Sequence, residues 1–167
     1  MQLQGIRVVD LSRIVAGPFC SMFLADMGAE VIKIEDVDEG DPVRKQGILR
    51  NGFSLYFASF NRNKRSLTLD LRSAEGKEVL RKLIATADVV LDNFRPGVME
   101  GLGIGSEALR AANPRLVTCS VPGYPVGHRA QHRPGYDALL QASSGQQWEQ
   151  PGWRAGPIFM PMPMPSS

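Results

Sequence analysis

The spacing of hydrophobic and polar positions changes several times along the chain, and these changes predict its elements. Residues 5–12 form a β-branched apolar run, typical of a buried strand, and small residues follow in a loop. Pro18 then opens a helix over residues 18–27, which Gly28 ends. The helix carries an apolar stripe at helical spacing, formed by Phe19, Met22, Phe23 and Met27.

Strand and helix patterns then alternate as far as residue 144. Further strands are predicted at residues 29–35, 66–71, 88–91 and 115–121. Further helices are predicted at residues 53–60, after the cap Ser73, around Met99 and Leu102, after the cap Ser106, and at residues 135–144. In the second strand, Lys33 and Glu35 are the polar positions. The polar stretch at residues 36–52 is a predicted loop, of a length that is often functional.

This alternation predicts an α/β fold, a Rossmann-like parallel sheet with helices on both faces. The regular pattern continues to residue 145 and decays from Gln146, so residues 146–167 are predicted to be an irregular segment. The sequence then stops without a closing element, which suggests a fragment of a longer protein.

Composition narrows the class of protein. A length of 167 residues suits one domain with a real core, and a net charge of +2 does not favour nucleic-acid or membrane binding. No apolar run approaches the roughly 18 residues that would span a bilayer. Cys20 and Cys119 fit buried thiols in a reducing compartment, although a disulfide stays open. We expect a cytoplasmic protein.

Several common sites are missing from the pattern. No glycine fingerprint for dinucleotides follows the first strand, and there is no P-loop. His128 and His132 are four residues apart without a carboxylate between them, so no metal site is predicted. Neither Ser12 nor Cys20 has an obvious histidine base, which argues against a nucleophilic triad.

Charged residues gather where the predicted strands end. Asp10, Asp70 and Asp92 would line one carboxyl edge of the sheet, and anchoring of loops is their simpler interpretation. Asp137, beside Tyr136, is most simply a helix cap. Four basic residues near the same ends suit a ligand with several phosphates, a solvated face being the alternative. They are Lys64, Arg65, Arg72 and Arg95.

Short motifs in a fixed order resemble one known family. They are LQGIRVVDLS at residues 3–12, AGP at 16–18, GAEVIKIE at 28–35, GDPVR at 40–44, NKRSL at 63–67, NFRPG at 93–97, NPRLV at 113–117 and GYD at 135–137. Together they resemble the amino-terminal part of the class III CoA-transferases, the family of formyl-CoA transferase, carnitine CoA-transferase and α-methylacyl-CoA racemase.

The resemblance implies a Rossmann-like large domain that binds CoA, here residues 1–145, followed by a small domain that this chain lacks. It implies an interlocked homodimer and transfer of CoA between an acyl-CoA and a carboxylic acid, through intermediates on an aspartate. Coenzyme A is then a substrate, and no cofactor is bound permanently.

The resemblance also implies site residues by position. Val15 and Ala16 match the loop beside the thioester. Segments around the adenosine phosphate are matched by Leu69, Asp70, Leu71, Arg72, Asn93, Phe94 and Arg95. Tyr136 and Asp137 match the acyl end. An ungapped count places the nucleophilic aspartate at Ser166, and a small insertion would place it past Ser167.

Departures from the family pattern leave alternatives open. Transferases of the formyl-CoA kind have a glutamine at Val15, an arginine near Asp36 and a basic residue near Gly101, and the racemase has a histidine at Tyr136. Since serine cannot form a mixed anhydride, the alternative is a catalytically altered acyl-CoA-binding pseudoenzyme or a racemase-like protein. A nucleotide-binding oxidoreductase is disfavoured by the missing glycine fingerprint.

Overall fold

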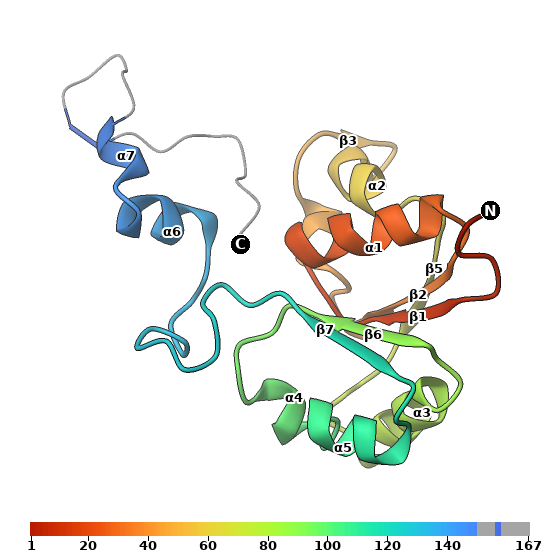
Figure 1. Cartoon of the computed structure of the whole chain (residues 1–167). Coiled ribbons are helices and arrows are strands. Elements are labelled where there is room, and N and C mark those ends of the chain that lie inside the picture. The colour runs from red at the N-terminus through yellow and green to blue at the C-terminus, as the bar shows by residue number, and fades with distance from the viewer. Residues whose placement is uncertain (150–155, 158–167) are drawn as a thin grey trace.

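The computed structural model describes residues 1–149 and 156–157, and its centre is a five-stranded parallel sheet (Figure 1). The strands lie in the order β5-β2-β1-β6-β7. Their bounds are β1 (Arg7–Asp10), β2 (Glu30–Glu35), β5 (Lys64–Thr68), β6 (Val89–Asp92) and β7 (Val117–Ser120). The parallel Rossmann-like sheet predicted from the sequence is therefore confirmed.

The strand order reverses at β1. The chain builds outward from β1 through β2 to β5, and then returns to place β6 and β7 on the other side. In open α/β sheets, the crevice at such a reversal, outside the carboxyl ends of the strands, is where ligands bind. The neighbouring carboxyl ends of β1 and β6 thus mark the place to look for a site.

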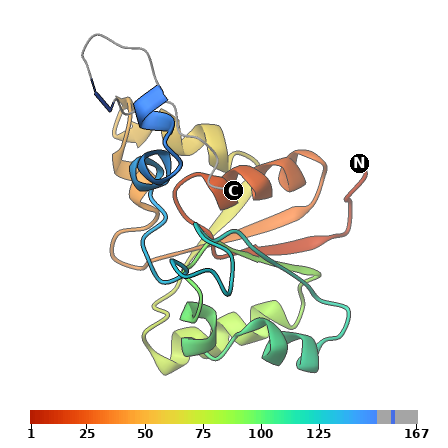
Figure 2. The ribbon, with the colours of Figure 1, turned by 60° about the vertical axis from the view of Figure 1, so that its left-hand side comes forward.

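Helices cover both faces of the sheet (Figures 1 and 2). One face carries α1 (Ala16–Asp26) and α2 (Leu55–Asn61), and the other carries α3 (Ala74–Ile84), α4 (Val98–Gly101) and α5 (Ser106–Ala112). Beyond the carboxyl edge lie α6 (Asp137–Ser143) and α7 (Gln146–Glu149). The α7 helix corrects the prediction that residues 146–149 are irregular, and the remainder of that segment lies outside the described residues except residues 156–157.

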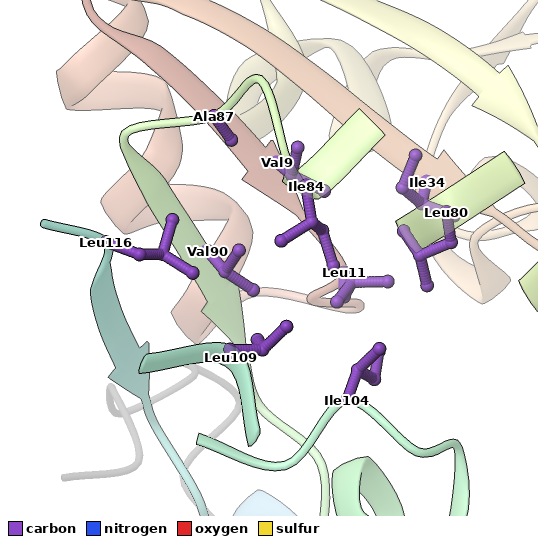
Figure 3. Packing of buried hydrophobic residues seen from close by; sticks show 10 residues of the cluster. All are labelled: Val9, Leu11, Ile34, Leu80, Ile84, Ala87, Val90, Ile104, Leu109 and Leu116. Atoms are coloured by element: carbon purple, nitrogen blue, oxygen red, sulfur yellow. The ribbon is translucent and has the colours of Figure 1, made fainter. Parts of the chain in front are cut away.

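The core has two parts because alternate strand residues point to opposite faces. The larger cluster fills the face under α3 and α5 (Figure 3) and comprises Val9, Leu11, Ile34, Leu80, Ile84, Ala87, Val90, Ile104, Leu109 and Leu116. The smaller cluster lies under α1 and comprises Val8, Ala25, Ala29 and Val31. Burial of these side chains fixes the sheet and hence the loops at its edges.

The buried face of α1 differs from the predicted apolar stripe. Met22 is buried, but Phe19, Phe23 and Met27 are 40%, 50% and 40% exposed, while Ser21 is fully buried. Ser21 lies inside because its hydroxyl donates a hydrogen bond of 2.5 Å to the buried Asp10 carboxylate. The rings of Phe19 and Phe23 pack edge to face with centroids 4.8 Å apart.

Three further boundaries differ from the sequence prediction. The predicted loop at residues 36–52 contains a 3₁₀ helix, η1 (Pro42–Lys45), and strand β3 (Leu49–Arg50), which pairs with β4 (Phe53–Ser54). Strand β5 begins two residues early, at Lys64. The N-cap of α5 is Gly105, not Ser106, whereas Ser73 caps α3 as predicted by accepting from the Gly76 N–H.

Candidate ligand-binding groove

Two cavities adjoin each other at the carboxyl edge of the sheet. The first, of about 200 Å³, lies between the segments that follow β2 and β5. The second, of about 440 Å³, lies between the segments that follow β1 and β6 and the start of α6. They share Arg13, Phe94 and Val98 as lining residues. We call the two together the groove.

The first cavity brings together residues predicted for the adenosine end. It is lined by Leu69, Asp70, Leu71 and Arg72, from the connection between β5 and α3, and by Phe94. Apolar walls alternate there with carboxylates from the β2 end, among them Glu35 and Asp41. The cavity therefore suits an uncharged group of mixed polarity better than a bare anion.

Arg72 is already neutralised by its neighbours. Its Nε lies 2.8 Å from the Asp70 Oδ1, and its Nη2 lies 3.1 Å from the Asp38 Oδ2. The hydrogen bonds that Arg72 donates to Asp70 and then to Asp38 raise the pKa of Arg72 further above its usual value. Because the side chain is 71% exposed, this arrangement is a surface network open to a ligand.

The second cavity brings together residues predicted for both ends of the ligand. It is lined by Asn93, Phe94 and Arg95, which follow β6, and by Tyr136, the N-cap of α6. Tyr136 is 64% exposed, so its ring forms an open wall. The family resemblance assigned residues 93–95 and Tyr136 to different ends of one ligand, and the structure places them around one cavity.

Arg13 is a groove residue that the sequence interpretation missed. Its guanidinium carbon lies 5.0 Å from the centroid of the Phe94 ring, a cation–π contact. Its backbone N–H donates to the Asn93 Oδ1 at 2.9 Å, and its carbonyl accepts from the Asn93 Nδ2 at 2.7 Å. Its place between the first strand and the first helix was the available signal.

The prediction that Lys64 and Arg65 join the cations of the groove is wrong. The Lys64 Nζ is buried and donates to the Pro18 carbonyl at 2.8 Å and to the Asp10 Oδ2 at 3.3 Å. Burial lowers the pKa of Lys64 to about 8, against the attraction of Asp10. Arg65 pairs with Glu30 at the amino end of β2, because β5 begins earlier than predicted.

Two strand-end carboxylates are loop anchors, as the simpler interpretation held. Asp10 accepts from the Ser12 N–H at 2.9 Å and from the hydroxyls of Ser12 and Ser21. Asp92 accepts from the Phe94 N–H at 3.0 Å and from the Ser120 hydroxyl at 3.2 Å. Burial raises the pKa of Asp92.

The other predicted site residues lie around the groove or outside the description. Val15 is the N-cap of α1 and Ala16 its first residue, next to the cavity residue Ile14. Asp137 is the first residue of α6 and not its cap, because the N-cap is Tyr136; its carboxylate accepts from the Gln141 amide at 3.2 Å. Ser166 lies outside the described residues.

Within residues 1–149 and 156–157, no group of three or more histidine, cysteine or acidic side chains is placed to hold a metal ion. Over the same residues, no helix has the length and apolar character needed to cross a bilayer.

An open, parallel α/β sheet with a groove at its strand reversal is an architecture in which ligands bind outside the carboxyl ends of the strands. A family model described as CoA-transferase family III matches residues 3–165, and the chain belongs to this family. The resemblance found in the sequence motifs is thereby confirmed.

Known relatives agree with this assignment. A mouse protein named succinyl-CoA:glutarate CoA-transferase is 41% identical over 144 residues, which cover 86% of this chain and 33% of the mouse protein. A formyl-CoA:oxalate CoA-transferase of Rhodopseudomonas palustris is 40% identical over 156 residues, 93% of this chain and 36% of that protein. The chain therefore spans about a third of the length of these relatives.

A solved structure shows the same fold. The crystal structure of a CAIB/BAIF family protein from Brucella suis superposes with a TM-score of 0.85 at 39% sequence identity. The match covers 96% of this chain and 43% of the Brucella chain. The whole described sheet with its helices is thus a fold found in larger members of this group.

Proposed function

We propose that these residues form the CoA-binding part of a CoA-transferase that moves CoA between an acyl-CoA and a carboxylic acid. The observation that carries the proposal is the groove, where residues 69–72, residues 93–95 and Tyr136 surround two adjoining cavities. These are segments that the family resemblance assigned to one long ligand. The mouse and Rhodopseudomonas relatives are named as enzymes acting on CoA thioesters of carboxylic acids.

Each of the two cavities would hold a different part of the ligand. Leu69, Leu71 and Phe94 give the first cavity apolar walls for an adenine ring, and the Asp70 carboxylate is an acceptor for ribose hydroxyl or amino groups. The second cavity leads toward Tyr136 and the loop before Ala16, where the thioester would lie. CoA would extend in this direction along the edge of the sheet.

We infer that the nucleophilic carboxylate of such an enzyme lies outside the described residues. Asp10 and Asp92 are buried and hydrogen-bonded as loop anchors, so neither is available to attack a thioester. We keep the position of Ser166, or a position past Ser167, for the residue that would carry the acyl group. A serine there would leave a CoA-binding protein without transferase activity.

The wider organisation belongs to the same proposal. Residues 1–145 would be the large domain, and the family's small domain and interlocked homodimer would complete the enzyme. Coenzyme A would be a substrate with no permanently bound cofactor, in a cytoplasmic protein. Sedimentation of the chain, and of a version extended by the reading frame past Ser167, would test the dimer, and a monomer in both would contradict it.

Calorimetry with CoA tests the binding function directly. We expect saturable binding by the 167-residue chain, and Arg72→Met should weaken it by about tenfold, because the variant leaves Asp70 and Asp38 facing the ligand uncompensated. Arg115→Met is the matched control, since this exposed arginine precedes β7 at the opposite edge. No heat at millimolar CoA would exclude the proposal.

Turnover separates the transferase from the pseudoenzyme. The version extended past Ser167 is incubated with an acyl-CoA and a carboxylic acid acceptor, and the products are separated by chromatography. Formation of the acceptor's CoA thioester supports the transferase, whereas CoA binding without any product over a panel of acids supports the pseudoenzyme.

A further inference from the structure

The loop between β1 and α1 contains a strained residue that lines one cavity of the groove. Ile14 has a φ of +69°, in the left-handed region that β-branched residues rarely adopt. Such conformations persist only where the surroundings impose them, and they concentrate at functional sites. Ile14 lines the second cavity, so the strain lies at the proposed ligand.

Side chains from two distant segments impose this conformation. The Ile14 N–H donates to the Asp41 carboxylate, 3.2 Å from its Oδ1 and 3.3 Å from its Oδ2. The preceding residue, Arg13, is held through both its N–H and its carbonyl by the single side-chain amide of Asn93. We call Asp41 and Asn93 the clamp.

The clamp is fixed from beneath by a buried ion pair. The Lys33 Nζ lies 2.8 Å from the Asp41 Oδ2, and both side chains are 1% exposed. The same Lys33 Nζ donates to the Ser12 carbonyl at 2.7 Å, and the Asp41 N–H donates to Glu35 at 2.9 Å. The loop is thus held rigidly before any ligand arrives.

This rigid loop presents a free cation. Arg13 is exposed, lines both cavities and stacks on Phe94. In the described part of the chain, no carboxylate lies within ion-pair distance of its guanidinium, whereas Arg72 already has two acidic partners. A guanidinium without a counter-charge at the junction of two cavities is the group best placed to meet an anion.

We propose that Arg13 binds the phosphate groups of the CoA ligand, and that Asp41 and Asn93 are positioning residues that hold it in place. The proposal rests on the proposed function, because it assumes that CoA occupies the groove. It assigns the phosphates to the junction of the cavities, between the adenosine in the first and the thioester in the second.

Calorimetry on Arg13 variants tests the binding role. Arg13→Met should weaken CoA binding at least tenfold and reduce its salt dependence, while binding of phosphate-free pantetheine stays unchanged. The CoA affinity of Arg13→Lys should lie between the affinities of the unaltered chain and Arg13→Met, since an ammonium keeps the charge but loses the planar stacking. Arg115→Met serves as the control. Equal CoA affinities of the unaltered chain and Arg13→Met would overturn the inference and leave the proposed function standing, whereas no CoA binding by the unaltered chain would overturn both.

A matched pair of double variants tests the positioning role. Lys33→Met with Asp41→Asn keeps an acceptor for the Ile14 N–H, and Lys33→Met with Asp41→Leu removes it at similar volume and charge. Both should fold, because neutral replacement of a buried ion pair is often tolerated. Where circular dichroism shows that the leucine variant does not fold, Asp41→Ala with Lys33→Met supplies the same loss.

The loss of CoA affinity caused by these double variants should not add to the loss caused by Arg13→Met. The leucine pair should weaken CoA binding about tenfold and the asparagine pair much less, and neither should change pantetheine binding. Combined with Arg13→Met, the leucine pair should add no further loss, since the clamp acts through Arg13. Additive losses, or equal affinities of the two pairs, would show that Asp41 has only a structural role.

Discussion

At the scale of the residue, buried charges hold the loops around the groove. Glu35 is 5% exposed at the end of β2 and accepts from Arg44 at 2.6 Å, from the Ser66 hydroxyl at 2.7 Å and from the Asp41 N–H at 2.9 Å. Burial by itself raises the pKa of Glu35, but these donors outweigh burial and lower it to about 2. The carboxylate thus orders residues 36–45 only while it is ionised.

This predicts a defined acid sensitivity. The unfolded chain has the ordinary glutamate pKa of 4.5 and binds the proton first as the pH falls. The contribution of Glu35, about 3 kcal/mol at most, is therefore complete above pH 4.5 and is lost toward pH 2. Urea unfolding of the native chain and Glu35→Gln should show a stability difference that shrinks over this range. Glu78→Gln, on the exposed side of α3, is the control, and a pH-independent difference for Glu35→Gln would contradict the prediction.

The sequence could not show that such residues are buried. Lys33 and Glu35 occupy the polar positions of an alternating strand, and alternation normally assigns these to solvent. Their partners, Asp41 and Arg44, come from a loop whose path depends on tertiary packing. Arg13 was missed for the same reason, since its position in the groove depends on contacts with Phe94 and Asn93, which are some 80 residues away in sequence.

At the scale of the element, the local patterns predicted the strands and helices well, but not their faces or register. Ser73 was identified as the cap of α3, because a cap depends on neighbours in sequence. The predicted buried face of α1 was wrong because the Ser21 hydroxyl donates a hydrogen bond to the buried Asp10 carboxylate. The early start of β5 turned Arg65 toward the amino edge, and pairing between strands, which decides this, is not a local property.

Close packing of α3 on the connection from β5 gives a second prediction. A Cβ atom added at Gly76 would lie 2.1 Å from the Asp70 carbonyl oxygen. Gly76→Ala should therefore cost about 1–3 kcal/mol and displace the segment that lines the first cavity, weakening CoA binding as well. At Gly101 an added Cβ meets nothing within 4 Å, so Gly101→Ala should do neither. Chemical denaturation and calorimetry measure the two effects, and equal behaviour of the two variants would refute the argument.

At the scale of the whole molecule, the sheet and its helices hold the hydrophobic core, whereas the end of the described chain adds a wall to the groove. In the described residues, the buried apolar side chains all lie between Val8 and Ala130. Beyond them, α6 and α7 lie past the carboxyl edge of the sheet (Figure 1). Alternating strands and helices made this sheet predictable, while the contribution of α6 to a groove depends on where the chain returns in space.

Truncation after Pro134 separates these roles. Because the core is complete before that residue, the shortened chain should unfold cooperatively, with a free energy of unfolding within about 1 kcal/mol of the parent. It should nevertheless bind CoA more weakly, since the second cavity loses the wall formed by Tyr136. Tyr136→Ala in the 167-residue chain is the matched control and should reproduce the loss of affinity without truncation. A shortened chain that fails to unfold cooperatively would show that α6 and α7 belong to the folding unit, and an unchanged CoA affinity would remove the second cavity from the proposed site.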